Sequence, residues 1–294
     1  MTAEVSEPQG HVFELPERAQ GRAIVAIARK ELGDAVRSRW FWMWASAFAV
    51  LAAVLALAAL PGSRIAGAAS YGRTAASLVA LTQIIVPLMA LTLGAQTIAA
   101  QRESGALRFL LSHPVNRTEA FWGLYLGTAA ALTAAAFAGF GAAGVVTALR
   151  SGGGEAGSYL RITFLAWALL LAMLGLGMLI STFARRASAA LGSAVFLWLV
   201  LVFVGDLGLM GTAIATRLSV STLFFSTIAN PVEAFRLASL ASFADSLDVL
   251  GPAGTYAVDA LGGALLPVIV GSLLAWMAIP VTIAWNRFRN RQDL

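Results

Sequence analysis

Six long apolar stretches divide this chain and constrain its fold more than any other feature. They cover residues of about 41–60, 77–100, 120–148, 160–183, 189–215 and 263–285. An α-helix needs roughly 20 apolar residues to cross about 30 Å of hydrocarbon, and each stretch reaches that length. The chain is 59% hydrophobic and only 12% charged, unlike a soluble domain. We therefore predict an all-α polytopic membrane protein with six transmembrane helices within residues 40–286.

The basic residues lie mainly on one side of these stretches. Six spans place both termini on the same side, which receives Arg18, Arg22, Arg29, Lys30, Arg37, Arg39, Arg102, Arg108, Arg117, Arg185, Arg186, Arg287, Arg289 and Arg291. The other side receives Arg64, Arg73, Arg150, Arg161, Arg217 and Arg236. Cytoplasmic segments are enriched in Lys and Arg, so we predict that both termini and the loops 102–118 and 184–188 are cytoplasmic. Arginines in such loops also argue against a nucleic-acid partner.

The two ends of the chain are polar. Residues 1–21 are expected to be a flexible cytoplasmic tail, and residues 287–294 a basic cytoplasmic tail. Residues 22–39 predict an amphipathic helix in the membrane interface, with an apolar face of Val25, Ala28, Leu32 and Val36. Its polar residues are Lys30, Glu31, Asp34 and Arg37. This helix either anchors the chain to membrane lipids or docks a cytoplasmic partner.

The cytoplasmic loop 102–118 is expected to contain a short helix at about 103–111, stopped before Pro114. One face of that helix would carry Leu107, Leu110 and Leu111. An apolar face beside charged residues must be buried against something. The alternatives are the lipid interface, a neighbouring span, or a groove on a soluble protein.

The longest segment between spans, about 216–262, forms a predicted cap on the outer side. Asn230 is a good N-cap, Pro231 suits the first helical position, and Glu233 stands where a capping box needs it. A helix is therefore expected at about 231–240, with Phe235 among its apolar residues. The cap either covers the ends of the spans or docks an outer-side protein.

The chain lacks the residues of a self-sufficient enzyme. It has no cysteine, and its single lysine, Lys30, is not preceded by the glycines of a phosphate-binding loop. We predict no catalytic, cofactor or metal site, so any ATP and Mg would bind a partner chain. Asp206 is interpreted as an interfacial or capping residue near the outer end of its span. A membrane enzyme therefore has little support.

Two glycine patterns are interpreted as helix packing. The run 139–144 matches GxGxxG but lies inside an apolar span with no strand before it, which argues against a nucleotide site. Gly123 and Gly127 form a GxxxG pair, which permits close helix contact within or between subunits.

The loop 103–117 resembles the E-x-G-T-hydrophobic-L-L-x-x-P-x-x-R stretch of the type-2 ABC transporter permeases. Glu103, Gly105, Leu110, Leu111, Pro114 and Arg117 match, whereas Ala106 replaces the usual Thr. The resemblance implies that this loop, with Leu107 on its helix, is a coupling helix that contacts a separate cytoplasmic ATPase. The permease itself would be non-catalytic.

A narrower resemblance, to the NosY family that serves nitrous oxide reductase maturation, rests on residues 29–40, 85–94 and 229–237. It implies a homodimer in the bacterial inner membrane, paired with two ATPase subunits and a periplasmic β-helical protein that assembles a copper site. Residues Asn230, Pro231, Glu233, Phe235 and Arg236 would then dock the periplasmic partner. The alternative is an exporter of a lipid, a sugar-lipid or a hydrophobic small molecule.

Overall fold

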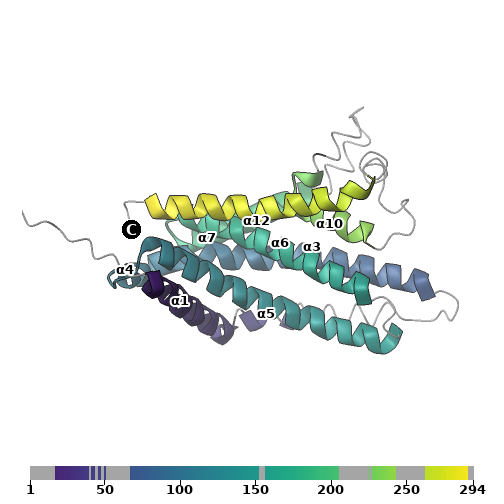
Figure 1. The fold of residues 1–294 in the computed structure, drawn as a ribbon, viewed down its shortest axis with the longest axis horizontal. Coiled ribbons are helices and arrows are strands. Elements are labelled where there is room, and N and C mark those ends of the chain that lie inside the picture. Colours follow the sequence, from purple (N-terminus) through teal and green to yellow (C-terminus); the bar gives the residue numbers. More distant parts are fainter. Residues whose placement is uncertain are drawn as a thin grey trace, which may run out of the picture.

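The computed structural model describes residues 17–39, 41–43, 46–47, 50, 67–151, 156–204, 225, 227–242 and 262–290. Every regular element within these ranges is a helix, as expected. Figure 1 shows long helices running side by side, with the short helix α4 at one end of the bundle and α10 towards the other. Most of the predicted first span, Asp206 and much of the predicted outer cap lie outside the described residues.

Four described helices are long and apolar enough to cross a membrane. They are α3 (Gly67–Glu103), α5 (Arg117–Ser151), α6 (Ala156–Phe183) and α12 (Leu265–Asn290). Their candidate spans are Ser77–Glu103, Arg117–Val145, Gly157–Phe183 and Gly262–Asn290. These four confirm the predicted spans at 77–100, 120–148, 160–183 and 263–285 as helices of spanning length.

The fifth apolar stretch is described only in part. Its described part comprises α7 (Ala187–Leu199) and a π-helical turn, η1 (Val200–Val204), and the remainder of 189–215 lies outside the described residues. The described chain therefore supports a multi-pass membrane protein with four candidate spans, and the expectation of six is not tested by it.

Helix α6 lies between α3 and α12 and is mostly buried. Leu169, Leu170 and Met173 are fully buried on it. Glycines allow the close approach: a Cβ on Gly177 would lie 2.6 Å from the Leu91 carbonyl oxygen of α3, and one on Gly175 would lie 2.8 Å from Val281 of α12. Since lipid provides little hydrophobic drive between helices, such small residues strengthen association by improving van der Waals contact.

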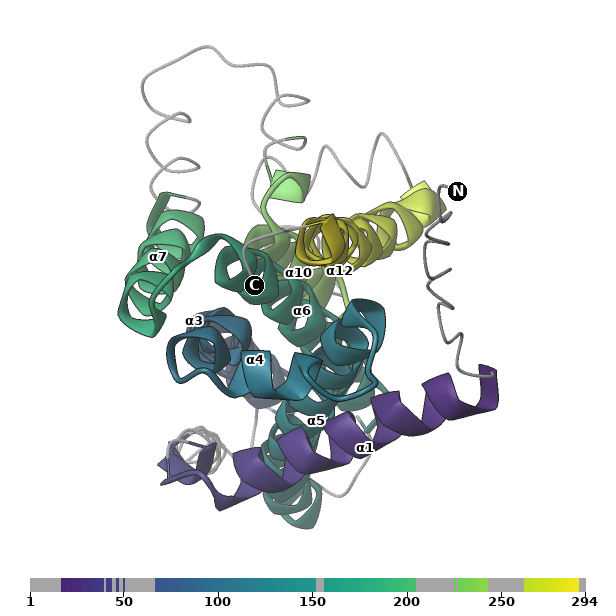
Figure 2. The same cartoon turned by 90° about the vertical axis from the view of Figure 1, so that its left-hand side faces the viewer.

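The N-terminal helix α1 (Glu17–Arg37) crosses α5, as the end-on view in Figure 2 shows. The GxxxG pair of α5 makes the contact within the chain. A Cβ on Gly123 would lie 2.6 Å from Ile27 Cβ, and one on Gly127 would lie 2.6 Å from Glu31 Cβ. The buried face of α1 is thus centred on Ile27, whereas Val25 of the expected apolar face is 66% exposed. The glycine groove, more than the hydrophobic pattern, selects the face that packs.

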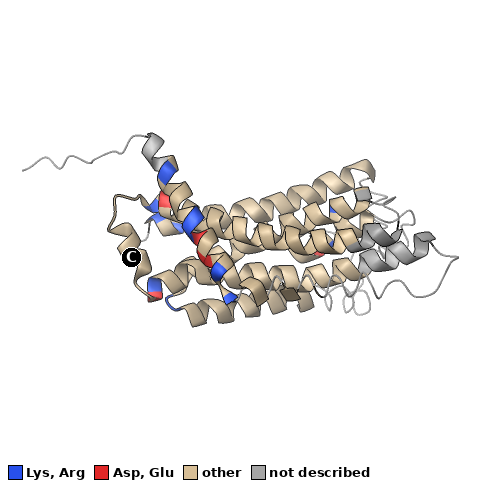
Figure 3. Ribbon diagram, turned by 90° about the horizontal axis from the view of Figure 1, so that it is seen from below, with Lys and Arg blue, Asp and Glu red and all other residues tan. Residues whose placement is uncertain are grey.

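Charged residues gather at the end of the bundle that carries α1, α4 and the end of α12 (Figure 3). Arg161, near the start of α6, and Glu233 and Arg236, on α10 (Pro231–Ala241), lie away from that end. This asymmetry agrees with the sorting of basic residues in the sequence.

Candidate functional site

The short helix α4 (Ala106–Leu111) follows α3 after a sharp turn. Gly105 has a φ of 77°, a left-handed conformation that favours glycine. The turn places Glu103 at the end of α3, so the expected helix at 103–111 begins three residues later than predicted. It ends at Leu111, with Ser112 as its C-cap, before Pro114 as expected.

The apolar face of α4 is covered by the bundle. Leu107 is 1% exposed, and Leu110 and Leu111 are partly buried against the main core. Of the alternatives open from the sequence, the neighbouring helices therefore bury this face. The leucines position α4 and leave its opposite face free to contact another molecule.

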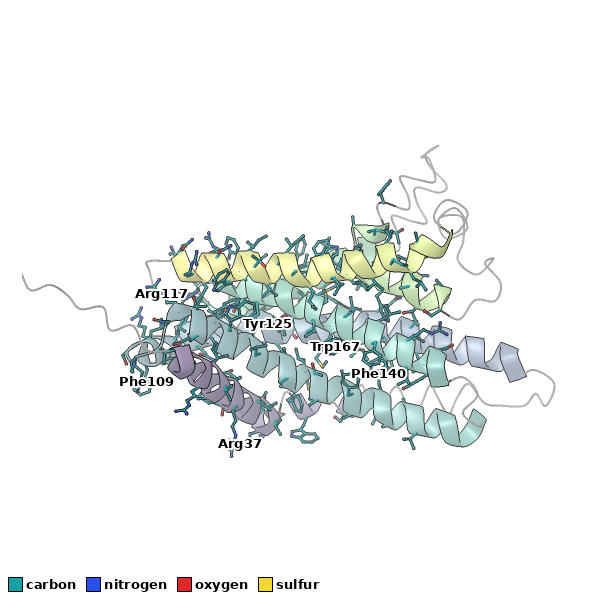
Figure 4. All side chains as sticks on the ribbon, viewed as in Figure 1. Arg37, Phe109, Arg117, Tyr125, Phe140 and Trp167 are labelled. Carbon is teal, nitrogen blue, oxygen red and sulfur yellow. The ribbon has the colours of Figure 1, made fainter. Side chains whose placement is uncertain are left out.

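The opposite face carries an aromatic tip that the sequence analysis did not single out. Phe109 is 71% exposed and lies at the same end of the bundle as Arg117 in Figure 4. The His113 ring stands edge-on to it, with ring centroids 4.9 Å apart. Ser112 Oγ donates to the Phe109 carbonyl oxygen at 2.8 Å, and His113 Nδ1 lies 3.0 Å from the same oxygen. The position of Phe109, two residues after the inward-facing Leu107, was the available signal for an outward side chain.

Glu103 joins α3 to the start of α7. Its Oε2 accepts a hydrogen bond of 2.7 Å from the Ala187 backbone N–H, at the first position of that helix. A carboxylate is favourable there because the helix dipole is positive at the N-terminus. Next to it, Arg102 Nη1 donates to the Ala184 carbonyl oxygen. Glu103 thus positions the loop between α6 and α7.

The residues after Pro114 fix the start of α5. The Asn116 backbone N–H donates to Glu119 Oε2 at 2.7 Å, which is half of a capping box. Glu119 is 3% exposed, and the spacing Asn116–Glu119 could have revealed it from the sequence. Arg117 Nη1 lies 3.4 Å from the Arg289 carbonyl oxygen near the end of α12, where a cation is favourable.

The polar residues of α1 divide between solvent and the bundle. Lys30 Nζ lies 2.9 Å from Asp34 Oδ2 and 3.4 Å from Glu31 Oε1. The hydrogen bond to Asp34 raises the pKa of Lys30 above its ordinary value. Glu31 also accepts a hydrogen bond of 2.8 Å from Gln101 Nε2 and so links α1 to α3, whereas Arg37 is exposed.

At the opposite end, α10 (Pro231–Ala241) is inserted against α3, α6 and α12. The predicted N-cap of this helix is confirmed: Asn230 Oδ1 accepts from the Val232 N–H at 3.0 Å. Asn230 Nδ2 donates to the Leu201 carbonyl oxygen of the π-helical turn at 2.6 Å. A π-helical turn disturbs the regular helical ladder, and the amide group is a partner for one of its carbonyls.

Most of the expected outer docking residues are buried. Pro231, Glu233 and Phe235 all lie inside the bundle. Arg236 is the accessible member, with its side chain 41% exposed and Nη1 3.8 Å from Glu233 Oε2. The buried residues therefore hold α10 in place, and an outer partner would meet mainly Arg236 and the residues near it. Among the described residues, no group of three or more His, Asp or Glu side chains is placed to hold a metal ion.

These features define a polytopic α-helical membrane subunit with a short helix presented at its charged end. The sequence pattern of ABC-2 family transporter proteins matches residues 25–294, and the chain belongs to this family. It is a permease subunit of an ABC transporter, a non-catalytic membrane component that functions with a separate ATPase subunit.

Two curated proteins are similar to this chain over most of its length. The probable ABC transporter permease protein NosY of Stutzerimonas stutzeri is 31% identical over 279 residues, which cover 90% of this chain and 97% of the relative. The protein of the same name from Pseudomonas aeruginosa is 30% identical over 275 residues, with the same coverage. The resemblance noted from residues 29–40, 85–94 and 229–237 therefore extends along nearly the whole chain.

Proposed function

We propose that this chain is the homodimeric permease of a NosY-type complex, with two cytoplasmic ATPase subunits bound at its charged end. The exposed tip of α4, formed by Arg108, Phe109, Ser112 and His113, would enter a cleft on each ATPase. ATP and Mg would bind the ATPases, and their closure would displace α4. The observation that carries this proposal is the exposure of Phe109 on a short helix whose leucines are held by the bundle.

The outer end of the same complex would act on a periplasmic β-helical protein that assembles the copper site of nitrous oxide reductase. The names of the two relatives and the coverage of about nine-tenths of this chain support this choice. Both termini would then be cytoplasmic in the bacterial inner membrane, in agreement with the charged end seen in Figure 3. Transmission of movement needs no ligand cluster on this chain.

The ATPase contact is tested by Phe109→Ala. An exposed aromatic that anchors an interface commonly contributes 1–2 kcal/mol or more, so affinity for the ATPase should fall about tenfold or more. Binding would be measured with the purified full-length permease in nanodiscs. Phe164→Ala is the matched control, because Phe164 is 57% exposed on α6 and away from α4. Equal affinity for both variants would remove α4 as the ATPase contact.

The maturation role is tested by deleting the chain from its native host. We expect nitrous oxide reductase to accumulate without its copper site, measured by metal content and by reduction of nitrous oxide. A fully loaded reductase would contradict the maturation role. Nucleotide-dependent movement of a labelled lipid in proteoliposomes would then favour the exporter alternative.

A further inference from the structure

The end of α3 makes polar contacts with α6 that the proposed function does not explain. Ser181 lies on α6 and is fully buried. Its Oγ accepts hydrogen bonds from two successive backbone N–H groups of α3, those of Ile98 at 3.0 Å and Ala99 at 2.8 Å. Both donors lie inside α3, where the usual partner is the carbonyl four residues earlier. A side-chain oxygen at this ladder is a recognised cause of a local bend.

Glycines place the serine within reach of the other helix. A Cβ on Gly94 of α3 would lie 2.8 Å from the Leu174 carbonyl oxygen of α6. Likewise, a Cβ on Gly177 of α6 would lie 2.6 Å from the Leu91 carbonyl oxygen of α3. The two backbones are therefore almost in contact about one turn before Ser181. This distance matters because a serine hydroxyl extends only one bond beyond Cβ.

The same end of α3 has two more contacts to the chain after Ser181. Arg102 donates to the Ala184 carbonyl oxygen, and Glu103 accepts from the Ala187 N–H. Residues 98–103 are thus hydrogen-bonded to the end of α6 and to the start of α7. Helix α4 begins three residues later, so a displacement of α4 acts on α3 next to this segment.

We propose that Ser181 is a positioning residue that joins the end of α3 to α6, so that both helices move as one body when α4 is displaced. Without this contact, the segment 98–103 would move independently of α6 and absorb the displacement. Helix α10 packs against both α3 and α6, so their joint movement reaches the opposite end of the bundle. The contact itself does not depend on the proposed function, whereas its role in coupling rests on it.

The contact is tested by hydrogen exchange of the full-length chain in nanodiscs. Ser181→Ala should speed exchange of the Ile98 and Ala99 amides about tenfold, because both lose an acceptor. Thr182→Ala is the matched control: Thr182 is equally buried, and its Oγ donates to Leu179 of its own helix at 2.7 Å. Equal exchange at Ile98 and Ala99 in the two variants would overturn the proposal. Should Ser181→Ala fail to fold, Ser181→Thr keeps the acceptor, and faster exchange in that variant would also overturn it.

The role in coupling is tested by spin-label distances in the complete complex with its ATPase. The chain has no cysteine, so Arg236→Cys on α10 and Leu126→Cys on α5 give two label sites in each copy, and doping labelled chains into an excess of unlabelled chains isolates the distance within one copy. ATP should change the distance between them in the parent and in Thr182→Ala, and at most half as much in Ser181→Ala, with ATPase binding unchanged within about twofold. A full change in Ser181→Ala would overturn the coupling role. No change in the parent, with the exchange result as expected, would contradict the proposed function and leave the Ser181 contact intact.

Discussion

At the scale of single residues, polar side chains at helix ends decide how the elements join. Asn230 accepts from the Val232 N–H and donates to the Leu201 carbonyl oxygen, so one amide group serves both α10 and the π-helical turn. Glu103, at the end of α3, accepts a hydrogen bond from the first residue of α7 and so joins these two helices. Such side chains stabilise the fold because the backbone N–H and C=O groups at a helix terminus have no hydrogen-bond partner within the helix itself.

Asn230→Ala should therefore destabilise the chain by about 1–3 kcal/mol, since it removes a cap and leaves a partly buried carbonyl without its donor. Asn230→Ser keeps an acceptor for the N-cap, but its side chain is too short to reach Leu201. Its free energy of unfolding should therefore lie between those of the parent and Asn230→Ala. Thermal unfolding in detergent measures both variants. Ser242→Ala, which removes only a hydrogen bond to Ala238 at the other end of α10, should have a smaller effect. A loss in Ser242→Ala as large as in Asn230→Ala would argue against a special role for Asn230.

Glu119 caps the start of α5 by accepting from the Asn116 backbone N–H. Glu119→Ala should cost about 1 kcal/mol through loss of the bond to the Asn116 N–H, while Glu119→Gln keeps an acceptor and should retain most of the stability. The same unfolding measurement applies. If the Gln variant were as unstable as the Ala variant, the carboxylate charge would matter more than the cap.

At the scale of elements, glycine grooves decide which helices pair. Gly123 and Gly127 admit α1, and Gly94 and Gly177 bring α3 onto α6. The grooves give close backbone contact that a hydrophobic pattern does not specify. Helix α1 thereby buries Ile27 and leaves Val25 exposed.

Gly127→Leu should displace α1 from α5, because even a Cβ at this position would lie 2.6 Å from Glu31 Cβ. We expect faster amide exchange over residues 21–37, by about tenfold or more, as the packing and the Gln101–Glu31 hydrogen bond are lost. Gly141→Leu is the matched control on the same helix, since nothing lies within 4 Å of its Cβ position. Unchanged exchange of α1 in Gly127→Leu would show that the groove does not hold it.

At the scale of the whole molecule, the two ends of the bundle differ in charge and in what they present. One end carries α4 and most of the described charged side chains, and the other carries the inserted helix α10 (Figures 1 and 3). The long helices of the bundle can cross a membrane, and a short helix is packed at each of its ends. This arrangement suits the transmission of a displacement from one side of the membrane to the other.

The orientation of this axis can be measured with single cysteines in the cysteine-free chain. In intact inner-membrane vesicles of known sidedness, a membrane-impermeant maleimide should label His113→Cys only from the cytoplasmic side. Arg236→Cys should be labelled only from the opposite side. Both side chains are accessible in the structure, so labelling reports the side. Labelling of both from the same side would contradict the proposed topology.

The class of this protein follows from its sequence. The four described candidate spans, the helix predicted at about 231–240 with its Asn230 N-cap, and the short helix before Pro114 are all set by local rules. Span length is set by bilayer thickness, and caps and prolines act within a few residues. Part of the candidate site could also be predicted, since the loop 103–117 resembles the corresponding stretch of type-2 ABC transporter permeases.

Which faces pack and which side chains remain exposed depends on contacts between helices that are distant in the sequence. The tertiary structure buried Leu107, brought out Phe109, placed Glu233 and Phe235 inside the bundle, and set Ser181 against the backbone of α3. These outcomes depend on the distance between helices, which is controlled by pairs of glycines far apart in the chain. In a span that is apolar all round, the periodicity of the sequence does not distinguish the lipid-facing side from the packed side. The side that packs is therefore determined by close contact between helices.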